Sequence, residues 1–151
     1  MDRLGRILVV VLLVWAVVAT GFAVKLYQEN VFLQKSLESI SESTITVSIG
    51  FDYGNGTVVW YNNTLVPRGA SLLSATVLLV NVEYKMSDFG AYVISINGVS
   101  EKIISKNEGF SWMWYIYDFE KEKLVMGPVA ADKYVLRDGD IILWKYEHWK
   151  F

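Results

Sequence analysis

The most prominent hydrophobic pattern in the chain is an apolar run close to its start. Residues 7–24 contain no charged side chain and are bounded by Arg6 and Lys25. At a helical rise of about 1.5 Å per residue the run reaches roughly 27 Å, close to the ~30 Å hydrocarbon core of a bilayer. The pattern therefore predicts a transmembrane helix over 7–24. The alternative is a cleaved signal peptide, although the apolar region of such peptides usually spans only about 7–15 residues.

The charges that flank this run say little about its orientation. Two arginines precede it, and Lys25 and Lys35 follow it, so the positive-inside rule hardly decides between the two orientations. We interpret residues 1–6 as a short cytoplasmic N-terminus. The protein is then expected in the cell membrane as a single-pass protein, with its C-terminal part outside the cytoplasm.

Two N-x-T sequons are consistent with export of the C-terminal part. They begin at Asn55 and Asn62, and we expect both asparagines to be glycosylation sites. Such triplets also arise often by chance, and the alternative is that these residues serve only in turns and at strand edges.

A second helical pattern follows the apolar run. Residues 25–43 contain good helix formers, no Gly or Pro, and a Ser-rich end, which predicts a helical stalk. Small residues permit close helix approach in lipid, and aliphatic residues at alternating gaps of three and four form coiled-coil seams. That spacing joins Ala16, Ala19, Ala23, Leu26, Leu33, Leu37 and Ile40, with Asn30 interposed. We hypothesise parallel homo-oligomerisation through residues 16–40; the alternative is a monomeric helix whose apolar stripe rests on its own domain or on the membrane surface.

From residue 44 onward the apolar positions alternate as they do in β-strands. Residues 44–67 are rich in β-branched and aromatic side chains and are divided by Gly54-Asn55-Gly56, which predicts a hairpin. Residues 70–80 are predicted to form one short helix, with a strand as the alternative. Further strands are predicted at 82–86, 90–98, 101–105, 109–118 and 138–149. This order predicts an α+β domain over 44–151, with a β-grasp-like mixed sheet of about five strands and one short helix.

Aromatic residues crowd the last part of the chain. Along 109–118, Trp112 and Trp114 fall on one face of the predicted strand, while Tyr115 and Tyr117 fall on the other. Apolar side chains on both faces predict a central strand that is covered on both sides. The functional alternative is an aromatic platform for a ligand or partner, because Trp and Tyr combine an apolar body with a polar tip. The candidate ligand-binding residues are Trp112, Trp114, Tyr117, Trp144, Tyr146 and Trp149, of which Tyr117 and Trp149 are expected to be more exposed than Trp112.

The composition excludes most catalytic and metal chemistry. The 151 residues are 53% hydrophobic, carry a formal net charge of −2, and include no cysteine and one histidine, His148. A chain without cysteine has no thiolate ligand or thiol nucleophile, and its acidic balance argues against nucleic-acid binding. No acid, base and nucleophile are placed in a recognisable pattern. We therefore predict no catalytic residues, no metal site and no enzymatic activity.

The polar residues that remain have structural explanations. Asp138-Gly139-Asp140 resembles half of a calcium site, but calcium takes about 6–8 oxygen ligands, and a tight turn explains the triplet better. Residues 120–123 alternate Glu and Lys, which is typical of a solvated loop or hairpin tip. His148 has no recognisable partner in the sequence and is expected to be structural or at the surface.

Three segments resemble a known family. The Trp-rich strand at 109–118, the segment 127–149 with its Asp138-Gly139-Asp140 turn, and residues 94–99 resemble the closing motif of domains related to the C-terminal domain of transcobalamin and intrinsic factor. The resemblance implies a β-grasp-like ligand-binding domain. The cobalamin carriers hold their ligand against a large α-helical barrel, for which this chain has no room, and residues 117–120 replace the Asn-Gly turn of the family. Cobalamin is thus implied by the resemblance alone, and no other cofactor is predicted.

Two classes of function remain. The first is a membrane-anchored extracytoplasmic binding module that recognises a small molecule or a surface protein through its aromatic-rich sheet. The second is a structural or accessory subunit, in which the anchor and stalk assemble with another membrane protein. The aromatic cluster decides between them, because the first class requires a concave patch with exposed Trp or Tyr, whereas burial of every indole would favour the second class.

Overall fold

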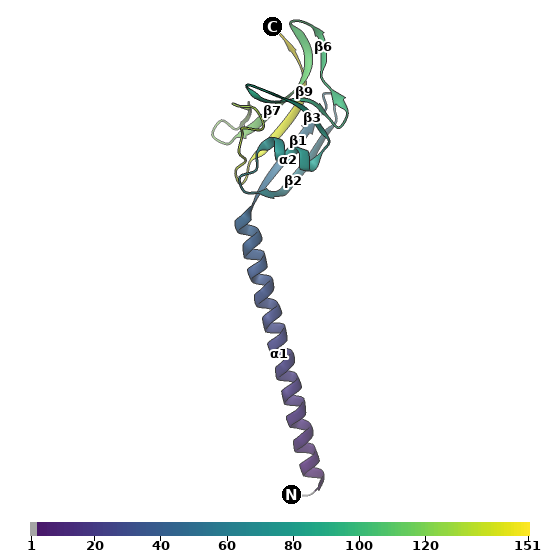
Figure 1. Cartoon of the computed structure of the whole chain (residues 1–151), viewed down its shortest axis with the longest axis vertical. Coiled ribbons are helices and arrows are strands. Elements are labelled where there is room, and N and C mark those ends of the chain that lie inside the picture. Colours follow the sequence, from purple (N-terminus) through teal and green to yellow (C-terminus); the bar gives the residue numbers. More distant parts are fainter. Residues whose placement is uncertain (1–2) are drawn as a thin grey trace. The chain divides into compact units, whose positions relative to one another are not determined.

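The computed structural model describes residues 3–151 (Figure 1). The chain divides into two compact units, with the boundary between Glu42 and Ser43. The first unit contains one long helix, and the second contains a short helix and all strands of the described chain. The predicted α+β class, with a mixed sheet and one short helix after a long apolar helix, is confirmed.

Helix α1 (Arg3–Ser43) runs without a break through the predicted transmembrane segment and the predicted stalk. Polar side chains of α1 form hydrogen bonds within the helix. Thr20 and Ser36 each donate to a backbone carbonyl one turn earlier, at 2.7 and 2.9 Å. Within residues 3–151, α1 is the helix that is long and apolar enough to cross a membrane, over Val11–Ser43. The length and apolar composition of this helix support a membrane span.

Strands β1 (Thr44–Asp52) and β2 (Val58–Pro67) form the predicted hairpin. Its turn contains Gly54 and Gly56, both with positive φ (69° and 88°), a backbone region that glycine enters without strain. A side chain at Gly54 would lie 2.5 Å from the carbonyl oxygen of Tyr146. The hairpin therefore depends on glycine at this position for both its turn and its contact with the neighbouring strand.

The larger sheet has six strands in the order β2-β1-β9-β7-β6, with β8 also paired to β7 (Figure 1). Strands β1 and β9 (Ile141–Lys150) are parallel, and every other described pair in this sheet is antiparallel. The remaining strands are β6 (Lys102–Ser105), β7 (Glu108–Asp118) and β8 (Lys123–Met126). The Trp-rich strand β7 thus lies beside β9 along nearly its whole length, as a central strand.

A second sheet was not predicted. It contains β3 (Val82–Ser87), β4 (Gly90–Ile96) and the short β5 (Val99–Ser100), where the sequence indicated members of one sheet. The turn between β4 and β5 uses Asn97 and Gly98 in the left-handed region, as the sequence indicated. The separation has a physical cause in the aromatic side chains: Trp112 donates to the carbonyl of Val99, and Tyr146 donates to that of Ser100. These bonds hold β5 over the larger sheet instead of at its edge.

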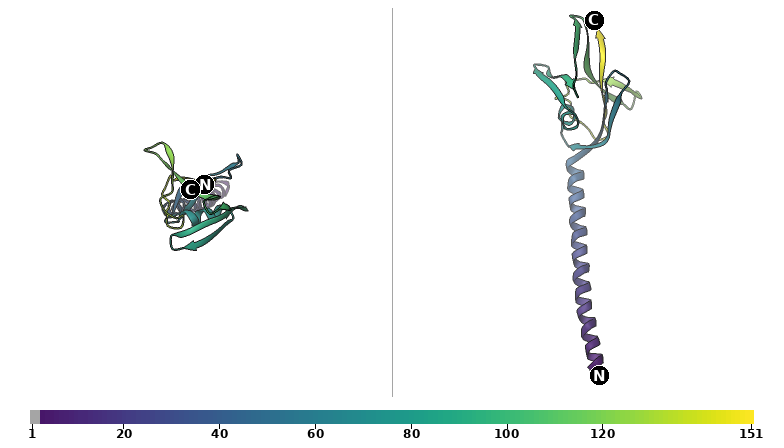
Figure 2. Two further views of the ribbon diagram at one scale, coloured as in Figure 1. Left: turned by 90° about the horizontal axis from the view of Figure 1, so that it is seen from above. Right: turned by 90° about the vertical axis from the view of Figure 1, so that its right-hand side faces the viewer.

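Helix α2 (Leu72–Leu79) confirms the helical interpretation of residues 70–80 over the strand alternative. Ser71 caps it by accepting from the backbone N–H of Ser74. Ala75 and Thr76 are fully buried, so small side chains let the helix approach the sheet closely. Figure 2 shows α2 and the β3–β4 hairpin on the same side of the larger sheet.

The hydrophobic core lies between these two layers. Strand β1 contributes alternate residues, and β7 and β9 contribute buried tryptophans. The core members from these strands are Ile45, Val47, Ile49, Phe51, Trp112, Trp114, Ile142 and Trp144. On the opposite face of β7, Met113, Tyr115 and Tyr117 are only half-buried. Leu143 of β9, which is paired with Tyr115, is 8% exposed, so the second face is partly covered and the expectation that β7 is covered on both sides holds in part.

We predict that Thr76→Val destabilises the domain by about 1–3 kcal/mol, because a buried donor loses its acceptor. Thr76 Oγ1 accepts from the indole Nε1 of Trp144 at 3.1 Å and donates to the carbonyl of Leu72 at 2.7 Å. Valine has nearly the same shape but cannot accept the hydrogen bond from the indole of Trp144. The measurement is denaturant unfolding of the full chain in detergent, followed by tryptophan fluorescence.

The matched control is Thr57→Val, since Thr57 is exposed in the β1–β2 turn. It should change the unfolding free energy by less than about 0.5 kcal/mol. Both variants should be produced in a host without N-glycosylation, because Thr57 belongs to a sequon. An equal loss in the two variants would contradict the role assigned to Thr76.

Candidate functional site

A pocket of about 260 Å³ lies between the two sheets. Strand β4 supplies one wall through residues 90–93, and the segment that follows β8 supplies another through Gly127, Val129, Ala130 and Ala131. Three predicted site residues, Trp112, Trp114 and Trp144, line the pocket. The structure therefore brings half of the predicted aromatic set to one concave site.

The indole N–H groups of these tryptophans are already used by the protein. Trp112 donates to the carbonyl of Val99 at 2.7 Å, and Trp114 donates to that of Val129 at 3.0 Å. Trp144 donates to Thr76. Because their donors are occupied, the indoles offer a ligand no directed hydrogen bond. Trp112, Trp114 and Trp144 are only 3%, 7% and 2% exposed, so each presents only a small apolar area to the pocket.

Two glycines allow the pocket walls to approach each other. A Cβ atom at Gly127 would lie 2.0 Å from the indole of Trp114, so this ring lies against bare backbone. A Cβ atom at Gly90, whose φ is 117°, would lie 2.5 Å from the side chain of Ala130. Any larger residue at either position would push the walls apart, which makes both glycines determinants of the pocket shape.

The mouth of the pocket is apolar and exposed. Phe89, Met126 and Val129 line the pocket and are 87%, 58% and 45% exposed. Phe89 stands in the turn between β3 and β4, and Met126 ends β8. Exposed apolar side chains that gather at a concave site are typical of a surface that contacts a ligand or partner.

A polar brace supports the pocket from behind. The ring of Tyr134 packs on Trp114, with ring centroids 4.9 Å apart. Its hydroxyl donates to Asp140 at 2.9 Å, and the same carboxylate oxygen accepts from the backbone N–H of Arg137. Burial, followed by the hydrogen bond to Asp140, raises the pKa of Tyr134 to about 12. The phenol is therefore neutral at physiological pH and keeps its donor.

The Asp138-Gly139-Asp140 triplet has the role of a turn. Asp138 accepts from the backbone N–H of Thr46 at 2.8 Å, and Gly139 has a φ of 83°. These contacts fix the entry into β9 beside β1. Within residues 3–151, no three His, Asp or Glu side chains come together as metal ligands.

The other predicted site residues lie outside the pocket. Tyr146 stacks on Phe110 with centroids 5.8 Å apart, and its hydroxyl is bound to Ser100. Tyr117 contacts Phe119, and the indole of Trp149 donates to Ser111 at 2.9 Å. Tyr117 and Trp149 are half-buried whereas Trp112 is 3% exposed, as expected.

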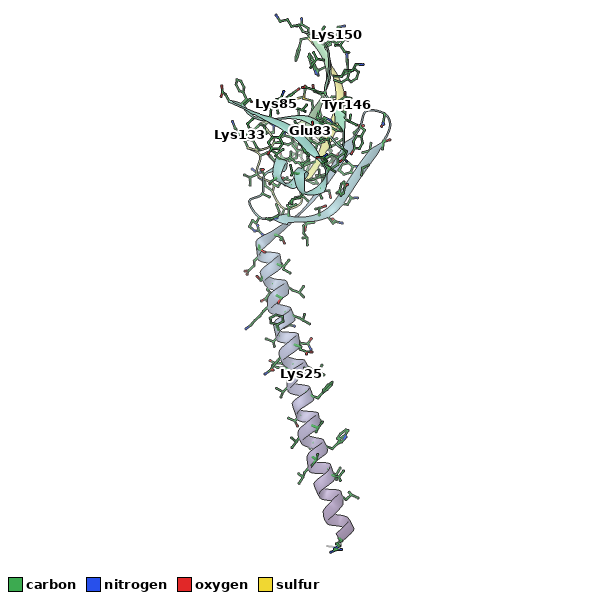
Figure 3. All side chains as sticks on the ribbon, turned by 45° about the vertical axis from the view of Figure 1, so that its right-hand side comes forward. Lys25, Glu83, Lys85, Lys133, Tyr146 and Lys150 are labelled. Atoms are coloured by element: carbon green, nitrogen blue, oxygen red, sulfur yellow. The ribbon has the colours of Figure 1, made fainter. Side chains whose placement is uncertain are left out.

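His148 has a partner that the sequence did not reveal. Its Nε2 lies 2.9 Å from a carboxylate oxygen of Glu108, and the Nζ of Lys150 lies 3.3 Å from the other oxygen. The β7–β9 register brings these residues together near the end of β9, beyond Tyr146 (Figure 3). His148 is exposed, as expected, but it has a partner in Glu108. Exposed ion pairs of this kind contribute little to stability.

Sequence reasoning missed the residues that shape the pocket. Phe89, Gly90 and Met126 were not candidates, and Gly127 appeared only as part of a linking segment. A Gly-Pro pair after a short strand signals a turn, but nothing in the sequence indicates that Trp114 lies against it. Trp60 was missed as well; it is the tryptophan of the described domain with the greatest exposure, at 42%.

The structure is thus an α+β domain with an open pocket that is lined by aromatic and small apolar residues. The chain belongs to the family described as domain of unknown function DUF4430, whose model matches residues 69–148, more than half of the chain. All residues that line the pocket lie within that match. A comparison with curated protein sequences finds no match.

Solved structures support the predicted resemblance. A crystal structure of haptocorrin in complex with Cbi matches with a TM-score of 0.52 at 17% identity, covering 69% of this chain and 25% of haptocorrin. A candidate metal-binding protein from Ruminococcus gnavus ATCC 29149 matches with a TM-score of 0.47 at 18% identity. The match covers 68% of this chain and 96% of that protein. The chain thus spans about a quarter of haptocorrin. The resemblance to the C-terminal domain of the transcobalamin family is confirmed at the level of the fold.

We predict that Tyr134→Phe changes how stability depends on alkaline pH. The folded pKa of Tyr134 is about 12, above its unfolded value of about 10. Its contribution is therefore fully present below about pH 10 and is lost as pH rises toward 12. Tyr134→Phe should be less stable than wild type at pH 7, and this difference should narrow above pH 10.

Urea unfolding at pH 7, 9, 10 and 11 measures this effect. Tyr84→Phe is the control, because Tyr84 is 45% exposed on β3. The control should differ from wild type by the same amount at each pH. A constant difference for Tyr134→Phe would show that the bond to Asp140 does not favour the neutral phenol.

Proposed function

We propose that this protein is a membrane-anchored, extracytoplasmic binding module whose ligand site is the pocket between β4, β7 and the segment after β8. The observation that carries the proposal is the wall of three indoles, each with its N–H already bonded inside the domain. Such a wall binds by shape and apolar contact. The exposed rim of Phe89, Met126 and Val129 extends the same chemistry to the surface.

The dimensions of the pocket define the group that it accepts. A volume of about 260 Å³ lies just below the ~300–1,000 Å³ of sites for drug-sized ligands. No charged side chain lines it. The site therefore suits an uncharged apolar group of one or two rings, either a small molecule or a side chain of a surface protein. A whole corrinoid is larger than a drug-sized ligand and does not fit, so cobalamin is not assigned to this pocket.

The proposed location rests on the first unit of the chain. Helix α1 supplies a segment suited to spanning a membrane, and the domain that follows it contains two sequons. Export places the pocket outside the cytoplasm, where it can meet extracellular ligands or surface proteins. No catalytic residues are proposed, because the titratable groups described above are engaged in turns, braces and surface pairs.

Binding is tested with indole as the probe and the full chain in lipid nanodiscs. Incorporation of 5-fluorotryptophan gives each tryptophan a ¹⁹F resonance, which single Trp→Phe variants assign. We expect indole to shift the signals of Trp112, Trp114 and Trp144 with a dissociation constant of about 1 mM or tighter. Phe89→Ala and Met126→Ala should weaken binding roughly threefold or more, because each removes part of the rim.

Phe119→Ala is the matched control. Phe119 is an exposed turn phenylalanine (66%) that does not line the pocket, so its removal should leave the indole affinity unchanged. A corrinoid should leave all three pocket signals unmoved. Indole shifts confined to Trp15 or Trp149, or spread equally over every tryptophan, would contradict binding in the pocket.

The accessory-subunit alternative is favoured by the surface of α1. Three of its seam leucines, Leu26, Leu33 and Leu37, are between 46% and 66% exposed. Aliphatic side chains at this spacing normally pack against a second helix. In the homo-oligomer that we propose through residues 16–40, the second helix belongs to another copy of the chain. In an accessory assembly, it belongs to another membrane protein.

Self-association is tested by crosslinking, since the natural chain has no cysteine. We expect Leu33→Cys to form a disulfide-linked dimer under mild oxidation in membranes. Lys35→Cys is the control: a step of two residues turns about 200° around a helix, which places position 35 on the other side. A monomeric product from both variants would reject the seam, and equal dimer from both would indicate random collision.

A further inference from the structure

Trp60 differs from the other tryptophans of the domain. It lies on β2 opposite Gly50 of β1, and a Cβ atom at Gly50 would be 2.8 Å from three ring atoms of its indole. One ring face thus lies flat on the bare backbone of β1. The side chain is nevertheless 42% exposed, so the other ring face is open to solvent.

The polar edge of this ring is also available. Trp112, Trp114, Trp144 and Trp149 each donate their indole N–H within the domain. Within residues 3–151, the N–H of Trp60 has no acceptor. An open ring face beside a free donor is suited to a ligand that has both apolar and hydroxyl-bearing sides.

Asn62 stands two residues further along the same strand. The regular pairing of β2 with β1 continues through Trp60 and Tyr61, and Asn62 is the first residue of the bulge that follows. Asn62 thus lies next to Trp60 along the edge strand. Asn62 is exposed, and its carboxamide makes no hydrogen bond within the described residues. It begins the sequon Asn62-Asn63-Thr64, where β2 has a bulge with Asn63 at a φ of 52°, and the backbone N–H of Asn63 donates to the hydroxyl of Ser48 at 3.4 Å.

We propose that Asn62 carries an N-linked glycan whose first sugar lies on the open face of Trp60. The donor would be a lipid-linked sugar phosphate, used by a membrane oligosaccharyltransferase. A bond forms between Nδ2 of Asn62 and the anomeric carbon, while the bond from that carbon to the phosphate oxygen breaks. The phosphate leaves with the bonding electrons, and Nδ2 loses one proton.

The position of β2 gives this contact a structural consequence. β2 is an edge strand of the larger sheet, and residues 58–66 contain no charged side chain. Uncharged, exposed edge strands invite pairing with other chains, and natural proteins cover or charge them. A glycan at Asn62 covers the middle of this edge and the exposed indole beside it.

The second sequon supplies an internal comparison. Asn55 also follows an aromatic residue by two positions, Tyr53. The ring of Tyr53 packs edge-on against Trp112 at 5.5 Å, and its hydroxyl accepts from Asn97 at 2.8 Å. Asn55 itself accepts from the backbone N–H of Thr57 at the turn. A glycan at Asn55 therefore finds no open ring, although the spacing in sequence is the same.

The test uses the full chain, produced in a yeast secretory host with N-glycosylation. Mass spectrometry measures occupancy in wild type, Asn55→Gln and Asn62→Gln, and thermal unfolding gives the melting midpoint with and without glycan. We expect the Asn62 glycan to raise the midpoint by roughly 3–6 °C, and the Asn55 glycan to leave it nearly unchanged. Enzymatic trimming to the first sugar should keep the rise.

Trp60 variants distinguish a specific contact from general bulk. In Trp60→Val, glycosylation should no longer raise the melting midpoint. Trp60→Phe keeps an aromatic ring and should retain part of the rise, so the contact can still be tested if Trp60→Val fails to fold. An unglycosylated Asn62, or an equal rise in Trp60→Val, overturns the proposal. The inference rests on the proposed export of the domain, and glycan at Asn55 without glycan at Asn62 would reject the inference while leaving export intact. None of these readouts involves the pocket, so the outcome is independent of ligand binding there.

Discussion

The domain is organised by three indole N–H bonds that fasten separate elements to one pair of strands. Trp112 and Trp114 on β7, and Trp144 on β9, project from the same face, where Trp114 and Trp144 are directly paired. Their acceptors belong to β5, to the segment after β8 and to α2. An indole is large enough to fill the core while its single donor selects one acceptor. The same residues therefore provide both the burial and the orientation of the layers above the sheet.

The pocket is a consequence of this arrangement. Each of the three tryptophans is bonded to a different element, and all three line the pocket. Gly127 and Gly90 keep the walls close, while Phe89 and Met126 remain at the surface. Because the indole donors are used for folding, selectivity at this site comes from size and apolar contact. A site of this kind accepts a range of similar groups more readily than one defined by directed hydrogen bonds.

Local patterns in the sequence predicted most of the elements, and long-range packing determined what they missed. The hairpin at 44–67, the short helix and the Trp-rich strand follow from strand-like alternation, turn glycines and apolar residues at helical spacing. The second sheet does not, because β5 has only two residues and its position depends on bonds from Trp112 and Tyr146. The candidate list likewise contained three pocket tryptophans, since aromatic density is visible in sequence. It contained no rim residue and no glycine, because contacts such as Gly127 against Trp114 join separate strands.

The tryptophans of the domain differ in whether their indole N–H groups donate within the fold. Where an indole donates inside the domain, it is part of the fold, and only its ring faces remain for a ligand. Trp60 has the opposite environment, with one face on Gly50, the other face open and a free donor. The ring of Trp60 contacts neither the second sheet nor the pocket. A smaller polar residue at this position would make the edge strand less prone to pair with other chains. Its position beside a sequon asparagine gives the exposed ring a partner that is supplied after synthesis, which accounts for an apolar surface that packing within the chain leaves unexplained.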